Sequence, residues 1–193
     1  MSAAVKKVDQ PESFTFSKEN LAKAEKIITK YPAGRQQSAV LPLLDLAQRQ
    51  SDNWLPKAAM DYVAEMLDMA PIRVYEVATF YTMFNLAPVG KNHIQICRTT
   101  PCWLRGSDDV TKACKDHAGV NISETSADGL FSLVEVECLG ACVNAPVVQI
   151  NDHYYEDLTA TSIAKIIEDL KAGHVVKPGS QIGRKCSAPV GVK

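Results

Sequence analysis

Four of the six cysteines in this chain of 193 residues form two closely spaced pairs, and their thiolates are the side chains best suited to chemistry. Four residues separate Cys97 from Cys102, and three separate Cys138 from Cys142. A donor set of soft thiolates suits an iron–sulfur cluster or zinc. Structural zinc sites use short turns around one ion, whereas a two-iron cluster is larger and takes two thiolates per iron. The wide spacing therefore favours one [2Fe–2S] cluster, with a zinc-stabilised interaction module as the alternative of another class.

Each pair begins where the sequence predicts the end of a strand. Residues 93–97 have the sequence HIQIC, and residues 132–138, SLVEVEC, alternate apolar and acidic side chains with a period of two. Loops at the same edge of one sheet can face each other. We therefore expect two distant segments to bring the four thiolates together.

The residues around the cysteines support the cluster interpretation. Thr100 is a suitable N-cap and Pro101 a suitable first residue of a helix. This start puts Cys102 in the first turn, where the helix dipole favours a thiolate. Gly140 lies inside the second pair, where its missing Cβ permits a positive φ and a close approach to a sulfide.

The remaining cysteines and the histidines show no ligand spacing. Two disulfides, 97–102 and 138–142, are a geometric alternative, but six cysteines without a signal peptide indicate a reducing compartment, where disulfides are rare. Neither pair has the C-x-x-C spacing of a redox-active dithiol. Cys114 is predicted to be a small buried residue, and Cys186 a spare thiol or an interface residue. Structural roles are expected for the four histidines, His93, His117, His153 and His174.

The composition excludes several classes of protein. Hydrophobic residues make up 46% and charged residues 22%, and the formal net charge of −1 gives no electrostatic case for binding nucleic acid. The sequence contains no run of about 18 apolar residues, so it predicts no direct insertion into a membrane. The start of the chain has neither the apolar core of a secretory signal nor the basic composition of a transit peptide. No glycine-rich nucleotide-binding motif is present, and no catalytic acid or base is expected in this chain.

The sequence predicts an α+β chain of two domains. A flexible N-terminus over residues 1–16 precedes a helical domain over residues 17–88. The breaker cluster Ala87-Pro88-Val89-Gly90 marks the domain boundary. The helical domain is expected to hold about four helices, starting near Ser17, Ser38, Pro56 and Pro71.

Residues 89–175 are predicted to form a thioredoxin-like α/β domain, because strand, helix and strand are followed by a hairpin and a helix. Further strands are expected over 146–150 and 153–155. The helices are expected over 102–117 and 159–171. An irregular tail is predicted over 176–193.

An aromatic run, Phe80-Tyr81-Thr82-Met83-Phe84, lies at the end of the last helix of the helical domain. Core packing is its expected role. An interface with a larger partner is the alternative.

Three stretches resemble the NuoE-type subunit of NADH:quinone oxidoreductase, respiratory complex I, in the thioredoxin-like ferredoxin family. They are Glu76 to Phe84 (EVATFYTMF), Ile96 to Cys102 (ICRTTPC) and Glu137 to Pro146 (ECLGACVNAP). The likeness covers about residues 14–191. Val190-Gly191 stands where the family is expected to have Gly-Gly. Similar tail residues are Lys177-Pro178-Gly179, Gly183-Arg184 and Ala188-Pro189.

The resemblance implies a low-potential [2Fe–2S] cluster that exchanges single electrons with FMN. Its implied ligands are Cys97, Cys102, Cys138 and Cys142. FMN and NADH would be bound only by the partner, a NuoF-type flavoprotein subunit, beside a neighbouring subunit of the peripheral arm. The chain would then be part of an enzyme, the proton-translocating NADH dehydrogenase. It would lie peripherally on the cytoplasmic side of the bacterial inner membrane, or on the matrix side in mitochondria. The alternative is an equivalent diaphorase subunit of an NAD-linked hydrogenase or formate dehydrogenase.

Overall fold

The computed structural model describes residues 8–185. The chain divides into two compact units, Met1–Pro88 and Val89–Lys193. Cys186 and the predicted tail motifs Ala188-Pro189 and Val190-Gly191 lie outside the described residues. In the described part of the chain, no helix has both the length and the apolar character needed to cross a bilayer.

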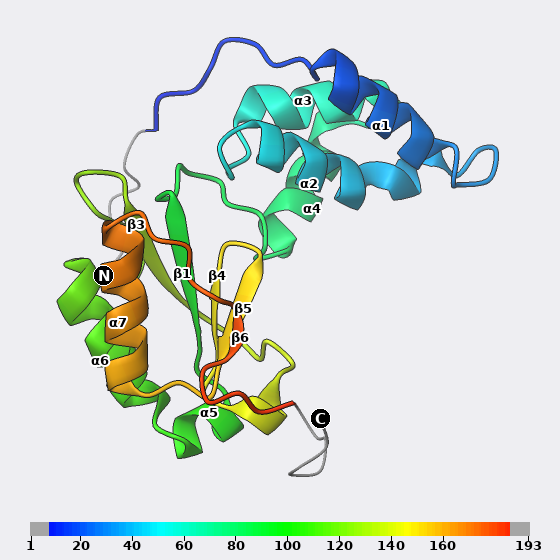
Figure 1. The fold of residues 1–193 in the computed structure, drawn as a ribbon. Coiled ribbons are helices and arrows are strands. Elements are labelled where there is room, and N and C mark those ends of the chain that lie inside the picture. The colour runs from blue at the N-terminus through cyan, green and yellow to red at the C-terminus, as the bar shows by residue number, and fades with distance from the viewer. Residues whose placement is uncertain (1–7, 186–193) are drawn as a thin grey trace. The chain divides into compact units, whose positions relative to one another are not determined.

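The first unit is helical (Figure 1). Each predicted helix start lies within two residues of an observed one, and the Ser17 hydroxyl caps α1 by accepting from the Asn20 N–H at 3.2 Å. The helices are α1 (Lys18–Ile28), the 3-10 helix η1 (Gln36–Ala39), α2 (Val40–Gln50), α3 (Lys57–Met66) and α4 (Pro71–Phe80). Their apolar faces share one core, which includes Ala24, Leu43, Leu44, Ala47, Ala59, Val63, Val74 and Ala78.

Aromatic side chains hold the segment before α1 against this unit. Phe14 and Phe16 each pack edge-on against Tyr62, with ring centroids 5.6 and 5.4 Å away, and Phe16 is buried. The Gln50 side chain donates to the Thr15 carbonyl at 2.8 Å. The prediction of a flexible N-terminus over residues 1–16 rested on the polar composition of the segment, which gave no sign that Phe14 and Phe16 pack against the helices.

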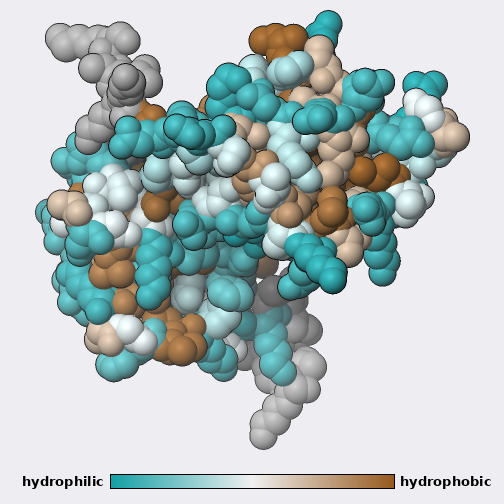
Figure 2. Space-filling model, turned by 90° about the horizontal axis from the view of Figure 1, so that it is seen from above, coloured by the Kyte–Doolittle hydropathy of each residue, from teal (hydrophilic) through white to brown (hydrophobic). Residues whose placement is uncertain are grey.

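The aromatic run at the end of α4 does not pack into the core as a whole, so its expected core role was wrong for four of its five residues, including Thr82, which is exposed. Phe84 is buried, but Phe80 is 76% exposed, Tyr81 40% and Met83 52%. α4 ends at Phe80, and Tyr81 has an extended backbone, so the chain leaves the helix at this point. On the face shown in Figure 2, apolar side chains form separate patches among hydrophilic ones.

The second unit is built on a mixed sheet with the strand order β2-β3-β1-β4-β5-β6 (Figure 1). The strands are β1 (Asn92–Cys97), β2 (Glu124–Thr125), β3 (Phe131–Val136), β4 (Val148–Ile150), β5 (His153–Glu156) and β6 (Gly179–Ser180). β1 runs parallel to β3 and antiparallel to β4. The four predicted strands are confirmed. The sequence did not predict β2 and β6, because strands of two residues are too short to show alternation.

Two long helices of this unit, α6 (Ser107–Ala118) and α7 (Ala160–Lys171), lie side by side against the sheet (Figure 1). Cys114 of α6 is fully buried between helix and sheet, which confirms its predicted role. The core also contains Ile94, Ile96, Val110, Phe131, Leu133, Val148, Ile163 and Ile167. The predicted α+β fold class is confirmed.

The prediction of one helix over residues 102–117 was wrong in one respect, because the structure has two helices there. α5 (Thr100–Leu104) ends before Gly106, and α6 begins directly after it. Gly106 has a φ of +92°, a left-handed conformation that interrupts a helix and that glycine adopts without steric cost. The break leaves a short helix beside the cysteines.

Gly90 lies where the chain enters β1, against the start of β3. A Cβ there would come within 2.4 Å of the Phe131 carbonyl carbon and 2.7 Å of the Ser132 nitrogen. Because both are backbone atoms, Gly90→Ala must push the two strands apart, and we expect a loss of about 1–3 kcal/mol in the stability of the second unit. Urea unfolding followed by Trp103 fluorescence, in a Trp54→Phe background, measures this loss.

Gly129→Asn is the matched control for Gly90→Ala. A Cβ at Gly129 meets nothing within 4 Å, and asparagine tolerates its φ of +69°. We expect the control to keep the unfolding midpoint of the parent protein. An unchanged midpoint in Gly90→Ala would contradict the close approach of β1 and β3.

Candidate metal centre

The parallel pairing of β1 with β3 brings the two cysteine pairs to one edge of the sheet. Cys97 is the last residue of β1 and is in register with the last residue of β3. Cys138 follows β3 by two residues, Cys102 lies in α5, and Cys142 begins the 3-10 helix η2 (Cys142–Asn144). Two loops that are distant in the sequence therefore meet beside the same strand ends.

The four thiols lie close to one another. The Sγ atoms of Cys138 and Cys142 are 3.4 Å apart, and Cys97 and Cys102 are near enough to change each other's pKa. Between the pairs, the charge of Cys97 acts on the pKa of both Cys138 and Cys142. In the residues that the structure describes, no three His, Cys, Asp or Glu side chains are arranged to hold a single metal ion. The thiols of the two pairs therefore lie near one another at the ends of β1 and β3.

Hydrogen bonds lower the pKa of one thiol in each pair. Burial acts to raise the pKa of Cys97, but the Thr99 hydroxyl, 3.4 Å from Cys97 Sγ, and the N–H groups of Leu139 and Thr99 bring it below its ordinary value. The pKa of Cys138 is lowered first by the Gly140 N–H, which donates to Cys138 Sγ at 3.4 Å. Gly140 has a φ of +81°, the positive φ expected from its position in the loop.

The other thiol of each pair has a raised pKa. Burial and the neighbouring Cys97 raise the pKa of Cys102 to about 12, and the hydrogen bond with Cys138 raises that of Cys142. This outcome differs from the expected effect of a helix N-terminus on Cys102. Burial dominates, because a helix of five residues is too short to build a large dipole.

The predicted N-cap was also displaced by one residue. Thr99, not Thr100, is the N-cap residue of α5, and its side chain makes no capping hydrogen bond. Its hydroxyl contacts Cys97 instead and lowers the pKa of Cys138 as well. Thr99 therefore links the two cysteine pairs. The sequence did contain a signal for this contact, because Thr99 has a hydroxyl group and stands only two residues after the candidate ligand Cys97.

Burial divides the four thiols into an inner pair and an outer pair. The inner pair, 1% exposed at each residue, is Cys97 and Cys102, and the outer pair, which is exposed, is Cys138 and Cys142. The loop of the outer pair is held by Tyr154, whose hydroxyl donates to the Leu139 carbonyl at 2.8 Å. The centre therefore has a buried side fixed by the sheet and an open side at the surface.

Large apolar side chains are exposed next to the cysteines in the sequence. Trp103 and Leu104 follow Cys102 in α5 and are 55% and 70% exposed, and Val143 follows Cys142 and is 52% exposed. Grouped apolar side chains at a surface are typical of a protein contact. We call these three residues the apolar rim.

The donor set fits a [2Fe–2S] cluster. Two thiols in each pair match two thiolates per iron, and hydrogen-bond donors point at sulfur atoms of both pairs. Three of the four histidines have carboxylate or hydroxyl partners elsewhere: His93 with Ser132, His117 with Glu168 and His174 with Asp169. The fourth, His153, is an exposed residue of β5.

Comparisons with known proteins agree with this fit. The family model described as thioredoxin-like [2Fe-2S] ferredoxin matches residues 24–171. The E-type subunit of NADH-quinone oxidoreductase from Rickettsia bellii is 64% identical over 159 residues, which are 82% of this chain and 95% of the relative. The mitochondrial NADH dehydrogenase [ubiquinone] flavoprotein 2 of Dictyostelium discoideum is 53% identical over 174 residues, 90% of this chain and 70% of that protein.

A solved structure shares the fold. An NAD+-reducing [NiFe]-hydrogenase in the air-oxidised state superposes with a TM-score of 0.59 at 21% identity, over 67% of this chain and 23% of the hydrogenase chain. At that identity the likeness concerns the fold alone. The resemblance predicted from the sequence is confirmed by the family model and by the relatives above. The chain belongs to the thioredoxin-like [2Fe–2S] ferredoxin family, among its E-type subunits of NADH-quinone oxidoreductase.

Proposed function

We propose that this chain holds one [2Fe–2S] cluster and exchanges single electrons with FMN on a partner flavoprotein subunit of NADH:quinone oxidoreductase. The proposed ligands are the inner pair, Cys97 and Cys102, and the outer pair, Cys138 and Cys142. The observation that carries the proposal is the meeting of these four thiols at one sheet edge, with the outer pair open to the surface. When bound, the cluster accepts and releases one electron at a time.

The chain's own residues prepare the site for negative charge. Metal ligation requires thiolates, and the donors around Cys97 and Cys138 favour the ionised forms of these two thiols. A four-thiolate cluster carries a net negative charge, which N–H and O–H donors stabilise. The Gly140 N–H and the Thr99 hydroxyl supply such donors. All four thiols must lose their protons when the metal binds, and the raised pKa values of Cys102 and Cys142 make these two the harder ones to ionise.

The open side of the centre faces the proposed partner. Electron exchange needs a short distance between the cluster and the flavin, and the exposed outer pair provides it without a deep protein layer. The apolar rim beside the cysteines supplies a contact surface, in which Trp103 is of the residue type most enriched at binding hot spots. The FMN and the NADH site are assigned to the partner, because this sequence contains no nucleotide-binding motif.

The proposed setting is the peripheral arm of the complex, beside the flavoprotein subunit and one neighbouring subunit. The chain would lie on the cytoplasmic side of a bacterial inner membrane, or on the matrix side in mitochondria. The support is that relatives sharing 53–64% of their residues carry the names of NADH-oxidising quinone reductase subunits.

Replacing a ligand tests the cluster assignment. We expect Cys97→Ala to lose most of the two irons and two sulfides per chain, because no other thiol described near the site can replace the buried one. Cys114→Ala is the matched control, since Cys114 lies in the core and should leave the visible and EPR spectra of the cluster unchanged. Colourless parent protein with one zinc would overturn the proposal in favour of the zinc module.

The order of thiol ionisation is a second test, made on the metal-free full chain. Iodoacetamide reacts with thiolates, so the initial rate follows the pKa of each exposed thiol. We expect Cys138 to reach half its maximal rate below pH 9 and Cys142 above it, because the first pKa is lowered and the second raised from 9.0. Mass spectrometry of peptides across a pH series gives both curves. Faster initial reaction of Cys142 would contradict the role of the Gly140 N–H.

The contact surface is tested by a charge at the apolar rim. We expect Leu104→Lys to weaken binding to the isolated flavoprotein subunit by about tenfold, equal to roughly 1.4 kcal/mol, because it places an ammonium group in an apolar contact. Val175→Lys is the matched control, since Val175 is fully exposed but does not adjoin the cysteines in the sequence. Calorimetric titration measures both affinities. Equal weakening by the two variants would argue against the apolar rim as the contact.

A further inference from the structure

The segment after α7 extends the sheet before it reaches the outer pair. β6 pairs in parallel with β5, with Ser180 opposite Glu156, and the Gln181 N–H donates to the Glu156 carbonyl at 3.0 Å. Residues 176–193 were predicted to be irregular. The described part of that tail is tied to the sheet as far as Arg184.

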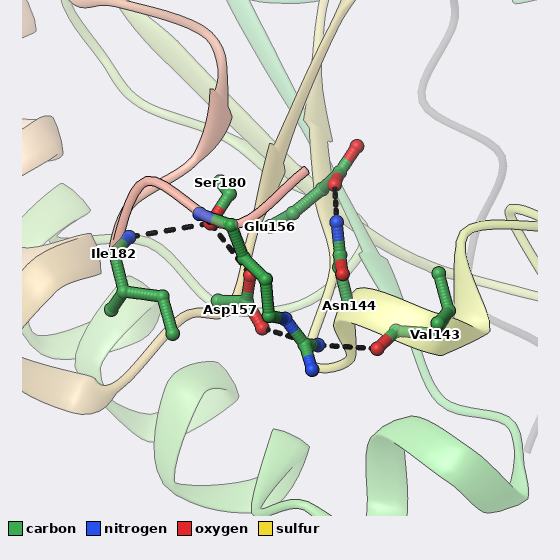
Figure 3. A network of polar contacts seen from close by, with 7 residues as sticks. Val143, Asn144, Glu156, Asp157, Ser180 and Ile182 are labelled. Atoms are coloured by element: carbon green, nitrogen blue, oxygen red, sulfur yellow. Dashed lines mark hydrogen bonds and ion pairs between the residues drawn. The ribbon is translucent and has the colours of Figure 1, made fainter. Parts of the chain in front are cut away.

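Asp157 is the residue to which this segment attaches (Figure 3). Its side chain is only 4% exposed. The Ser180 hydroxyl donates to Asp157 Oδ2 at 2.7 Å, and Arg184 Nη2 donates to Asp157 Oδ1 at 2.8 Å. A buried carboxylate is costly unless it is paired and hydrogen-bonded. The tail supplies both of these bonds.

Arg184 also reaches the loop of the outer pair. The same Nη2 donates to the carbonyl of Val143, the residue directly after that pair. The loop is fixed from the sheet side as well. The Asp157 N–H donates to the Asn144 carbonyl at 2.7 Å. Asn144 Nδ2 donates to Glu156 Oε2 at 2.6 Å (Figure 3). One positive charge, on Arg184, and two negative charges, on Asp157 and Glu156, therefore lie next to a proposed ligand loop that is 41 residues away from Arg184 in the sequence.

We propose that Arg184 and Asp157 form a charge clamp that positions the outer-pair loop and sets the reduction potential of the cluster. This inference rests on the proposed function of the four cysteines. Reduction adds one negative charge to the cluster, so a nearby cation favours the reduced form and a nearby anion disfavours it. In the intact protein the two charges of the clamp oppose each other. Both residues are positioning residues, and neither is a ligand.

The two charges give the clamp a signature that a purely mechanical role lacks. Removing the cation leaves the buried Asp157 carboxylate without its counter-ion, which disfavours reduction. Removing the carboxylate leaves the Arg184 cation, which favours reduction. Loss of a mechanical tie alone would change the potential in the same direction in both variants. The sign of the shift therefore separates the two roles.

The test is a potentiometric titration of the reconstituted full chain, followed by the EPR signal of the reduced cluster. We expect Arg184→Gln to lower, and Asp157→Asn to raise, the ratio of reduced to oxidised cluster at a fixed potential by at least threefold. A threefold change is about 28 mV at 59 mV per tenfold for one electron. In the Arg184→Gln, Asp157→Asn double variant the ratio should return to within threefold of the parent. Asparagine suits position 157, whose φ is +54°.

Two further variants complete the design. Arg184→Lys keeps the charge and should stay within threefold of the parent ratio. Lys171→Gln removes an equal charge at the other end of the sheet, since Lys171 acts on Asp128 in the loop before β3, and it should leave the ratio unchanged. Shifts of the two single variants in the same direction, or no return in the double variant, would overturn the clamp.

Loading with iron and sulfide separates failure of this inference from failure of the proposed function. Parent protein that binds no two-iron cluster would overturn both. A second outcome is that the parent protein loads a two-iron cluster normally while the ratio of reduced to oxidised cluster in the single variants changes no more than in the Lys171→Gln control. That result would overturn the charge clamp and leave the proposed function intact. If Arg184→Gln does not retain its cluster, the upward shift of Asp157→Asn decides, and its absence overturns the clamp.

Discussion

The parallel hydrogen bonding of β1 with β3 is the contact on which the candidate centre depends. Neither cysteine pair can surround a two-iron cluster alone, because each supplies only two thiols. Parallel strands end at the same edge, so the register that sets Cys97 opposite the last residue of β3 also brings the Cys138 loop beside it. The core under α6 and α7 holds this register through buried side chains of both strands. Gly90 permits the backbones to approach at the other end.

Burial and hydrogen bonding then give the four thiols different environments. The sheet buries the inner pair and raises the pKa of Cys102, whereas the outer pair stays at the surface. Donors from a hydroxyl and from backbone N–H groups lower the pKa of one thiol in each pair. The arrangement suits a subunit that holds an anionic cluster firmly on one side and presents it to a partner on the other. In the proposed function, the chemistry on NADH is left to that partner.

The described part of the C-terminal tail belongs to this design. Its strand β6 lengthens the sheet, and its arginine joins a buried carboxylate to the loop of the outer pair. A tail that looks irregular by composition thereby contributes both a mechanical tie and a local charge. Thr99 also has two roles, since it is the N-cap residue of α5 and its hydroxyl contacts the thiol of Cys97 at the end of β1.

Local patterns in the sequence determined the fold class, the helix starts near Ser17, Pro56 and Pro71, the main strands and the family, because caps, periodicity and motif spacing act over a few residues. They also identified the four cysteines as a group. Only the tertiary structure decided which thiols are buried, that Thr99 contacts a thiol instead of capping a helix, and that Phe16 packs into the helical core. Only the tertiary structure revealed the hydrogen bond from Arg184 to the Val143 carbonyl. These features depend on contacts between segments far apart in the chain, which composition and spacing do not encode.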